Sequence, residues 1–291
     1  MTDIADGATC VVTGGTSGLG REVALLLARR GAAVTIVGRN PERAVATVAD
    51  LRLAGARRAH AVVGDLSAQA DVRRIAADLL SSHPRIHVLV NNAGGLFLRR
   101  KLSVDGIEMT WALNHLSYFL LTLLLRPRLE ASAPARIVNV ASEAHAAGRL
   151  RFDNPAAVTG PAAYQQSKLA NVLFTHALAR RLRGTGVTVN AVHPGRVESG
   201  FGTNNGWLWT VAKPFVHRRA MTPEEAAPAI ARMAIGPSMA ALSGRYFDRD
   251  REATPAPQAL DDVAAERLWT MSARMVGLEL DEPSSSLAAA R

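Results

Sequence analysis

Short β-branched runs alternate with longer helical patterns along most of the chain. Six runs have the nearly continuous apolar character of strands buried on both faces of a parallel sheet, and they cover residues 8–13, 33–37, 59–63, 87–90, 136–140 and 187–192. A seventh strand is predicted at residues 244–247. Because helical patterns separate these runs, the sequence predicts one doubly wound α/β sheet of about seven strands, covered by helices on both faces.

Several helix ends are marked by residues with known positional preferences. Asn40 places an N-cap residue directly before Pro41, which suits the first position of a helix. Two long helical segments are expected at residues 105–125 and 162–182. Gly184 then supplies a stop before the sixth predicted strand, so a helix and a parallel strand follow each other there as well.

The chain shows no internal repeat, linker or low-complexity segment that would divide the predicted sheet. Residues 1–250 are therefore expected to form one domain, with residues 251–291 as a helical extension of the same domain. The last stretch, residues 283–291, is rich in Ser and Ala and is expected to fray.

One loop is unusually apolar. Residues 195–220 contain many Gly and Asn residues but also Trp207, Trp209 and Phe215, which do not suit a loop that is only solvated. Two interpretations remain open for this loop, a mobile flap over a substrate or a connection whose aromatic side chains pack onto the body.

Composition narrows the class of protein. The chain has 291 residues, of which 48% are hydrophobic and 20% charged, and this excludes a disordered or collagen-like protein. The single cysteine, Cys10, lies inside the first predicted strand and is interpreted as a core residue, so a disulfide framework is excluded. A polar start and the lack of a long apolar run predict a soluble, cytoplasmic protein that does not bind membranes.

The net charge of +9 would suit an anionic partner. The arginines are scattered in short pairs whose members point to different helix faces, so nucleic-acid binding is not expected. The chain has only three lysines, among them Lys168, although arginine is frequent. A retained lysine is a candidate for a role that needs a compact ammonium group. The eight histidines show no metal-ligand spacing, and His193 is interpreted as a packed strand-end residue.

A glycine-rich turn follows the first predicted strand and precedes a helix. It runs from Thr13 through Gly14, Gly15, Thr16, Ser17, Gly18 and Leu19 to Gly20. Glycines allow a tight turn and let the backbone approach a pyrophosphate at the helix N-terminus, where free N–H groups favour negative charge. The spacing departs from the common G-x-G-x-x-G pattern, and a simple strand-to-helix turn would also use glycine.

The end of the second predicted strand supports a dinucleotide site. In Rossmann-type folds this position meets the adenosine ribose, with an acid for a free 2'-hydroxyl and an arginine for a 2'-phosphate. Here the strand ends in Arg39, and Arg43 follows one helical turn later. These residues favour NADP over NAD, although a solvated surface arginine is the competing interpretation.

Tyr164 and Lys168 lie four residues apart at the start of a long predicted helix, hence on one face of it. A nearby ammonium group favours the phenolate form of tyrosine and should lower its pKa toward neutral pH. The pair is therefore predicted to act as an acid/base.

Taken together, these motifs resemble the short-chain dehydrogenase/reductase family over residues 8–250. The matching positions are Thr13 to Gly20, Asp65-Leu66, Asn91-Asn92-Ala93-Gly94, Asn114, Ser142, Tyr164 with Lys168, and Pro194-Gly195. The stretches 133–140, 167–171 and 191–195 are similar to the retinol dehydrogenase-like branch, which mostly prefers NADP. Two features depart from that branch. The membrane anchor of many retinol dehydrogenases is not expected here, and Ala141 stands where a second serine is usual, so a retinoid substrate is not implied.

The resemblance implies a role for each matching residue. Tyr164 would donate a proton to a carbonyl oxygen, Lys168 would lower its pKa and hold the nicotinamide ribose, Ser142 would orient the carbonyl, and Asn114 would hold a water of a proton relay. The cofactor-binding residues would be Gly14, Thr16, Ser17, Gly18, Leu19, Gly20, Arg39, Asp65, Leu66, Asn92, Ala93, Gly94, Tyr164, Lys168, Pro194, Gly195 and Val197.

The sequence thus predicts an NADP(H)-dependent oxidoreductase that interconverts an alcohol and a ketone or aldehyde, without a metal. An apolar small molecule is the expected substrate, and the long helices could form a homo-oligomer interface. A non-catalytic NADP-binding redox sensor is one alternative, but the presence of Asn114, Ser142, Tyr164 and Lys168 together argues against it. A structural or nucleic-acid-binding protein is the other alternative, suggested only by the net charge.

Overall fold

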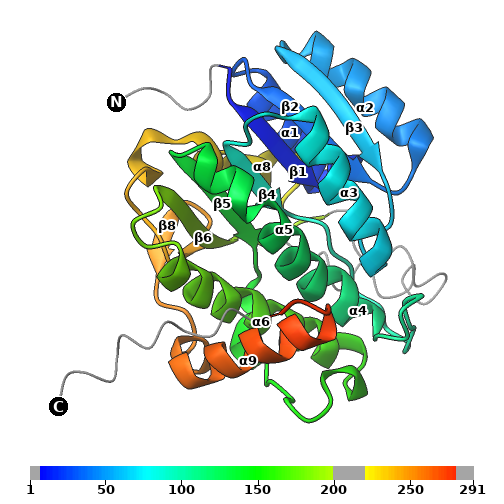
Figure 1. Cartoon of the computed structure of the whole chain (residues 1–291), viewed down its shortest axis with the longest axis vertical. Coiled ribbons are helices and arrows are strands. Elements are labelled where there is room, and N and C mark those ends of the chain that lie inside the picture. The colour runs from blue at the N-terminus through cyan, green and yellow to red at the C-terminus, as the bar shows by residue number, and fades with distance from the viewer. Residues whose placement is uncertain (1–6, 199–219, 280–291) are drawn as a thin grey trace.

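The computed structural model describes residues 7–198 and 220–279. Within them a single sheet has the strand order β3-β2-β1-β4-β5-β6-β7-β8 (Figure 1). The strands are β1 (Thr9–Thr13), β2 (Ala33–Gly38), β3 (Arg58–Val63), β4 (Val88–Asn91), β5 (Ala135–Val140), β6 (Val187–His193), β7 (Arg245–Asp248) and β8 (Arg251–Ala253). This arrangement confirms a single-domain Rossmann-type α/β fold.

The seven predicted strands are all present, and each of their ends lies within one residue of its predicted position. They pair in parallel from β3 to β7. The eighth strand was not predicted and corrects the expected count: β8 pairs antiparallel with β7 at the edge of the sheet. It belongs to the segment expected to be only a helical extension.

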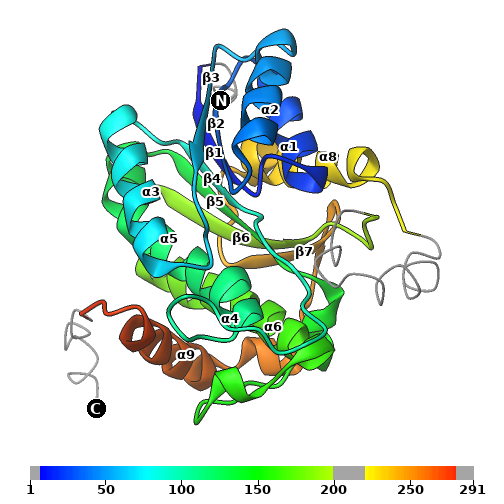
Figure 2. The same ribbon diagram turned by 90° about the vertical axis from the view of Figure 1, so that its right-hand side faces the viewer.

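Helices cover both faces of the sheet (Figure 2). On one face lie α1 (Gly18–Ala28), α2 (Pro41–Leu53) and α8 (Pro223–Ile235), and on the other lie α3 (Gln69–Ser82), α5 (Ser117–Ala131) and α6 (Gly160–Arg181). The short α4 (Met109–Trp111) precedes α5, and α9 (Asp262–Met275) packs against α6.

Because helices pack on both faces of the sheet, the protein has two apolar cores, one on each face. In β1, Cys10 and Val12 belong to the core under α1 and α8, whereas Val11 belongs to the core under α3, α5 and α6. All three side chains are fully buried, which explains why the strand carries no polar alternation. The interpretation of Cys10 as a core residue is confirmed, and burial raises the pKa of its thiol to about 12.

The long helix predicted at residues 105–125 begins later than expected. Residues 102–108 instead form a turn closed by a bridge between Leu102 and Glu108. The buried carboxylate of Glu108 then accepts a hydrogen bond from the Trp111 backbone N–H at 2.9 Å and so starts α4. A π-helical turn, η1 (Ala112–Leu116), separates α4 from α5. The second long helix, predicted at residues 162–182, is confirmed as α6.

The outer side of α6 is covered by α9. The Arg181 guanidinium lies 3.9 Å from the centre of the Trp269 ring and pairs with Glu266, and Arg180 pairs with Glu266 as well. The long helices suggested from sequence as a homo-oligomer interface are α5 and α6, on which α3 and α9 pack, and that interface stays a prediction.

The sequence raises expectations about membrane-spanning helices, about the apolar loop and about the C-terminal end. Among the described residues, no helix is both long and apolar enough to span a lipid bilayer. Most of the loop at residues 195–220, including Trp207, Trp209 and Phe215, lies outside the described residues, as do residues 283–291.

Candidate active site

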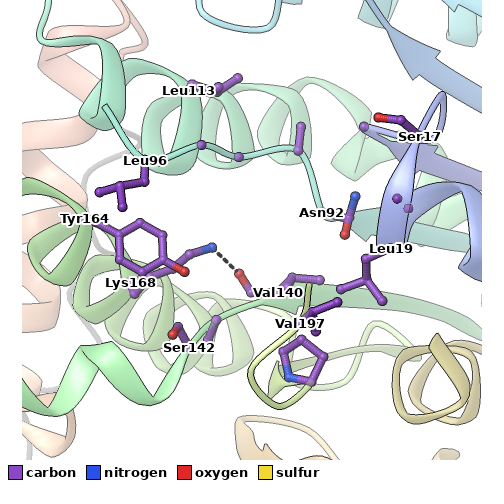
Figure 3. A pocket seen from close by; sticks show the side chains of 18 of the residues that line it. Ser17, Leu19, Asn92, Leu96, Leu113, Val140, Ser142, Tyr164, Lys168 and Val197 are labelled. Carbon is purple, nitrogen blue, oxygen red and sulfur yellow. Dashed lines mark hydrogen bonds between the residues drawn. The ribbon is translucent and has the colours of Figure 1, made fainter. Parts of the chain in front are cut away.

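A cavity of about 870 Å³ opens at the carboxyl edge of the sheet, where β1, β4, β5 and β6 end. The strand order reverses between β1 and β4, which is where ligands bind in doubly wound folds. Most residues proposed from the sequence line this cavity (Figure 3), namely Gly14, Thr16, Ser17, Gly18, Leu19, Gly20, Arg39, Leu66, Asn92, Ala93, Gly94, Ser142, Tyr164, Lys168, Pro194, Gly195 and Val197.

Thr13 at the end of β1 ties the glycine turn to the end of β4. Its hydroxyl donates to the Val90 carbonyl and accepts from the backbone N–H groups of Asn92 and Ala93, at 2.9 and 3.0 Å. The Asn92 amide donates in return to the Thr13 carbonyl at 2.9 Å. These bonds hold two neighbouring strand ends together and fix one wall of the cavity.

The glycines of the turn are required by close contacts. Gly14 has a φ of +66°, and a Cβ there would lie 3.0 Å from the Ala93 backbone. A Cβ on Gly20 would lie only 2.3 Å from the Gly14 carbonyl oxygen. Side chains at either position would fill the concave turn that leads into α1.

Replacing Gly20 by Ala should therefore displace the turn. We expect the affinity for a dinucleotide to fall by about tenfold or more, because the backbone can no longer approach its phosphates. Titration calorimetry with NADPH would measure this loss. An unchanged affinity in a folded variant would show that the turn does not hold the phosphates.

The first turn of α1 offers an anion site. Among the described residues, no side chain caps this helix and no acidic residue lies in its first turn. The free N–H groups and the helix dipole thus face the cavity at Ser17 and Gly18. Arg39 and Arg43 are exposed on the same rim, at the end of β2 and the start of α2. These two guanidinium groups can bind a further phosphate group by charge-assisted hydrogen bonds.

Tyr164 and Lys168 project from one face of α6 toward the end of β5, as Figure 3 shows. The Lys168 ammonium group donates to the Val140 carbonyl at 2.8 Å. It also lies 5.6 Å from the Tyr164 ring centre and 5.8 Å from that of Tyr118. Ser142 follows directly after the β5 end, and its hydroxyl is close enough to the Tyr164 phenol to affect the pKa of that group. The three groups predicted to act together are thus brought together.

The pKa of Tyr164 in the folded protein differs from the value that the sequence leads us to expect. Burial raises the pKa of the Tyr164 phenol to about 12, and the hydrogen bond with Ser142 opposes that rise only in part. Burial also lowers the pKa of the Lys168 ammonium from 10.5 to about 7. The prediction that Lys168 brings the Tyr164 pKa toward neutral pH is therefore wrong for the protein alone, because desolvation dominates both groups.

Asn114 lies behind the cavity wall rather than on it, within η1. Its side chain accepts from the Gly95 N–H at 2.8 Å and donates to the Gly95 carbonyl and to Ser167. Its backbone carbonyl accepts from the Asn171 amide at 2.9 Å. Asn114 thus fixes the chain after β4 against α6, and its predicted role in a water relay stays a prediction.

Asp65 also does not line the cavity, although its neighbours Gly64 and Leu66 do. Its carboxylate accepts hydrogen bonds from both the N–H and the hydroxyl of Ser67, at 2.9 and 2.8 Å. The proposed contact of Asp65 with an adenine stays a prediction.

Several lining residues were not predicted from the sequence. Glu143 and Arg196 form an ion pair at 2.6 Å between the loops after β5 and β6. Leu96, Leu113 and Pro161 add apolar surface to the cavity wall, and Leu96 lies beside Tyr164 in Figure 3. These five residues lie near recognisable motifs in the sequence, but their residue types and spacing give no sign that they line a cavity.

His193 also lines the cavity at the end of β6 and is buried, as expected of a packed strand-end residue. Burial lowers the pKa of its ring. The described part of the chain contains no group of three His, Cys, Asp or Glu side chains that could hold a metal ion.

Comparison with known proteins places these features in a family. Residues 8–206 match the sequence model of the short chain dehydrogenases. Human retinol dehydrogenase 13 is 41% identical over 285 residues, which cover 94% of this chain and 86% of that protein. A solved structure of a putative uncharacterized protein from Mycobacterium paratuberculosis is 30% identical and has a TM-score of 0.76, covering 95% of this chain and 96% of that one.

A second solved structure, the RhlG/NADP active-site complex of Pseudomonas aeruginosa, has a TM-score of 0.69 and 29% identity and covers 86% of this chain and 98% of that one. The glycine turn, the Tyr164–Lys168 pair and every described residue that lines the cavity except Ala220 lie in the part of the chain that the sequence model matches. The chain thus belongs to the short-chain dehydrogenase/reductase family of oxidoreductases, with retinol dehydrogenases among its relatives.

Proposed function

We propose that this protein is an NADP(H)-dependent oxidoreductase that interconverts an alcohol and a ketone or aldehyde, with Tyr164 as the general acid/base. One observation carries the proposal: α6 and β5 bring Tyr164, Lys168 and Ser142 into the same cavity as the glycine turn. A proton donor and a dinucleotide cradle in one cavity are what hydride transfer to a carbonyl requires.

The residues of the cavity fit a dinucleotide phosphate. The turn leaves no room for a side chain at Gly14 or Gly20, and the uncapped start of α1 would hold the pyrophosphate. Arg39 and Arg43 would hold the 2'-phosphate, and a relative of known structure carries NADP in its active site. When bound, NADP(H) supplies or accepts the hydride.

Cofactor preference should follow Arg39. We expect Arg39→Asp to lower NADPH affinity by at least about tenfold, because a charge-assisted bond is replaced by repulsion. NADH affinity should change much less. Arg30→Asp makes the same charge change at an exposed position outside the cavity and serves as the control. Parallel losses for both cofactors in Arg39→Asp would defeat the assignment.

The protein's own residues supply the proton chemistry. In reduction the Tyr164 hydroxyl donates its proton to the carbonyl oxygen, and a pKa of about 12 keeps this group protonated at neutral pH. Ser142, which lines the cavity near Tyr164, would hydrogen-bond the substrate oxygen and so fix its position relative to the Tyr164 hydroxyl. The Lys168 ammonium, held by the Val140 carbonyl, stabilises the phenolate that proton donation leaves behind.

The cavity wall favours an apolar carbonyl substrate. Leu96, Leu113 and Pro161 line it, and Ala141 presents a methyl group where a hydroxyl would add polarity. A panel of aliphatic, aromatic and isoprenoid aldehydes and ketones, retinaldehyde included, would be screened by the loss of NADPH absorbance. Turnover of apolar carbonyls is expected. Tight NADPH binding without any turnover would instead favour a redox sensor.

A further inference from the structure

His145 links the loop after β5 to the C-terminal part of the chain. It lies in the short 3-10 helix η2 (Glu143–Ala147), three residues after Ser142, and is buried. Its Nδ1 lies 2.8 Å from the Ser142 carbonyl oxygen. Its Nε2 accepts a hydrogen bond from the backbone N–H of Ala256 at 3.0 Å.

These two partners determine the protonation state of the ring. The Ala256 N–H can only donate, so Nε2 must be the unprotonated nitrogen. The Ser142 carbonyl can only accept, so Nδ1 must carry the proton and donate it. A neutral His145 with its proton on Nδ1 satisfies both bonds, and the opposite tautomer satisfies neither.

The rest of the surroundings immobilises the ring. Tyr246 on β7 packs against it with ring centres 4.8 Å apart. The Gln258 amide donates to the carbonyl of Ala146 at 2.7 Å, within the same 3-10 helix. The segment after β8 thus contacts η2 through Ala256 and Gln258, and His145 joins this segment to Ser142.

Ser142 needs such support because it lies where the strand has already ended. Its hydroxyl accepts from the Ala144 N–H at 3.2 Å and is close enough to the Tyr164 phenol to affect the pKa of that group. The backbone carbonyl of Ser142 accepts from both the N–H and the ring of His145. We propose that His145 is a positioning residue that holds Ser142 in register with Tyr164, and that the C-terminal segment fixes it in the required tautomer. The inference rests on the proposed carbonyl reduction.

Two substitutions of His145 test its hydrogen bonds to Ser142 and to Ala256 one at a time. His145→Asn places an amide N–H near the former Nδ1 and can still donate to the Ser142 carbonyl. His145→Gln places its amide near the former Nε2 and can still accept from Ala256, but it leaves the Ser142 carbonyl without the ring donor. We expect kcat to fall about tenfold or more in the Gln variant, with NADPH affinity unchanged, and the Asn variant to keep at least several times the kcat of the Gln variant.

A double-mutant cycle tests whether the effect passes through Ser142. In a Ser142→Ala background the further change His145→Gln should lower kcat by less than about twofold, because the side chain that His145 positions is gone. A loss of the same size in both backgrounds, or an Asn variant as slow as the Gln variant, would overturn the proposal and leave His145 a packing residue.

Two measurements do not depend on turnover. In ¹⁵N-labelled wild-type protein, the His145 resonances should identify a protonated Nδ1 and an unprotonated Nε2, and the reverse assignment would overturn the inference. The Ala144 amide, bonded to the Ser142 hydroxyl, should exchange with solvent faster in the Gln variant than in the Asn variant. These results stand even if no carbonyl of the panel is reduced, which would count against the proposed function alone.

Discussion

Tyr164→Phe is expected to lower kcat for carbonyl reduction by about 10² to 10⁴, because proton donation by a positioned group contributes a factor of this size. The substitution removes one hydroxyl and keeps the ring beside Lys168 in the cavity wall. The glycine turn and Arg39 are untouched. NADPH should therefore bind with unchanged affinity, and the melting temperature should barely move.

The loss should appear in the chemical step itself. Single-turnover reduction with prebound NADPH is expected to slow as much as steady-state turnover, since the missing proton acts after binding. If the Phe variant kept more than about a tenth of the wild-type single-turnover rate, the proton would come from another donor. The assignment of Tyr164 as the acid would then be wrong.

The strands could be predicted closely because most of them carry a short, largely apolar and β-branched run. β1 shows the reason: its side chains enter two cores on opposite faces, so burial rather than alternation defines the strand. β8 has only three residues, Arg251, Glu252 and Ala253, and two of them are exposed charges. No local pattern indicates such an edge strand, which forms because β7 offers an antiparallel partner.

The start of the helix after β4 could not be predicted for a similar reason. The sequence pattern places residues 105–108 in the helix, but the bridge between Leu102 and Glu108 and the cap that Glu108 provides depend on side-chain and backbone pairing. The π-helical turn at Asn114 likewise requires the Asn171 amide of α6, which is 57 residues away in the sequence. A periodicity analysis cannot detect either contact.

The candidate site was predictable where its residues form contiguous motifs. The glycine turn and the Tyr164–Lys168 pair are local patterns, and the cavity contains both. The Glu143–Arg196 ion pair and the Ala256–His145 hydrogen bond join segments that are far apart in the sequence, so no spacing indicates them. The pKa values were mispredicted because the pair was considered alone, whereas desolvation by the surrounding core dominates.

Lys168→Arg is expected to be nearly as damaging as the loss of Tyr164, although the positive charge is kept. Lys168 is buried, with 4% of its surface exposed, and its ammonium group bonds one carbonyl between two tyrosine rings. A guanidinium group has five donors and a planar shape, so it would bury unpaired N–H groups and displace Tyr164. We expect kcat to fall by about 10² or more in a folded variant. Turnover near the wild-type rate would show that the lysine is incidental.

The buried Lys168 should also change how the free energy of unfolding depends on pH, and this can be measured without a substrate. Its pKa is 10.5 as an ordinary side chain and about 7 in the folded protein, so between these values the unfolded chain binds more protons than the folded one. Stability must then rise with pH across this window. Lys168→Met is neutral in both states and lacks this contribution. The difference in unfolding free energy between wild type and Lys168→Met should therefore shift by about 2 kcal/mol in favour of the wild type from pH 7 to pH 9. Urea unfolding at both pH values measures it, and a difference that does not change with pH would mean that Lys168 keeps an ordinary pKa in the folded protein.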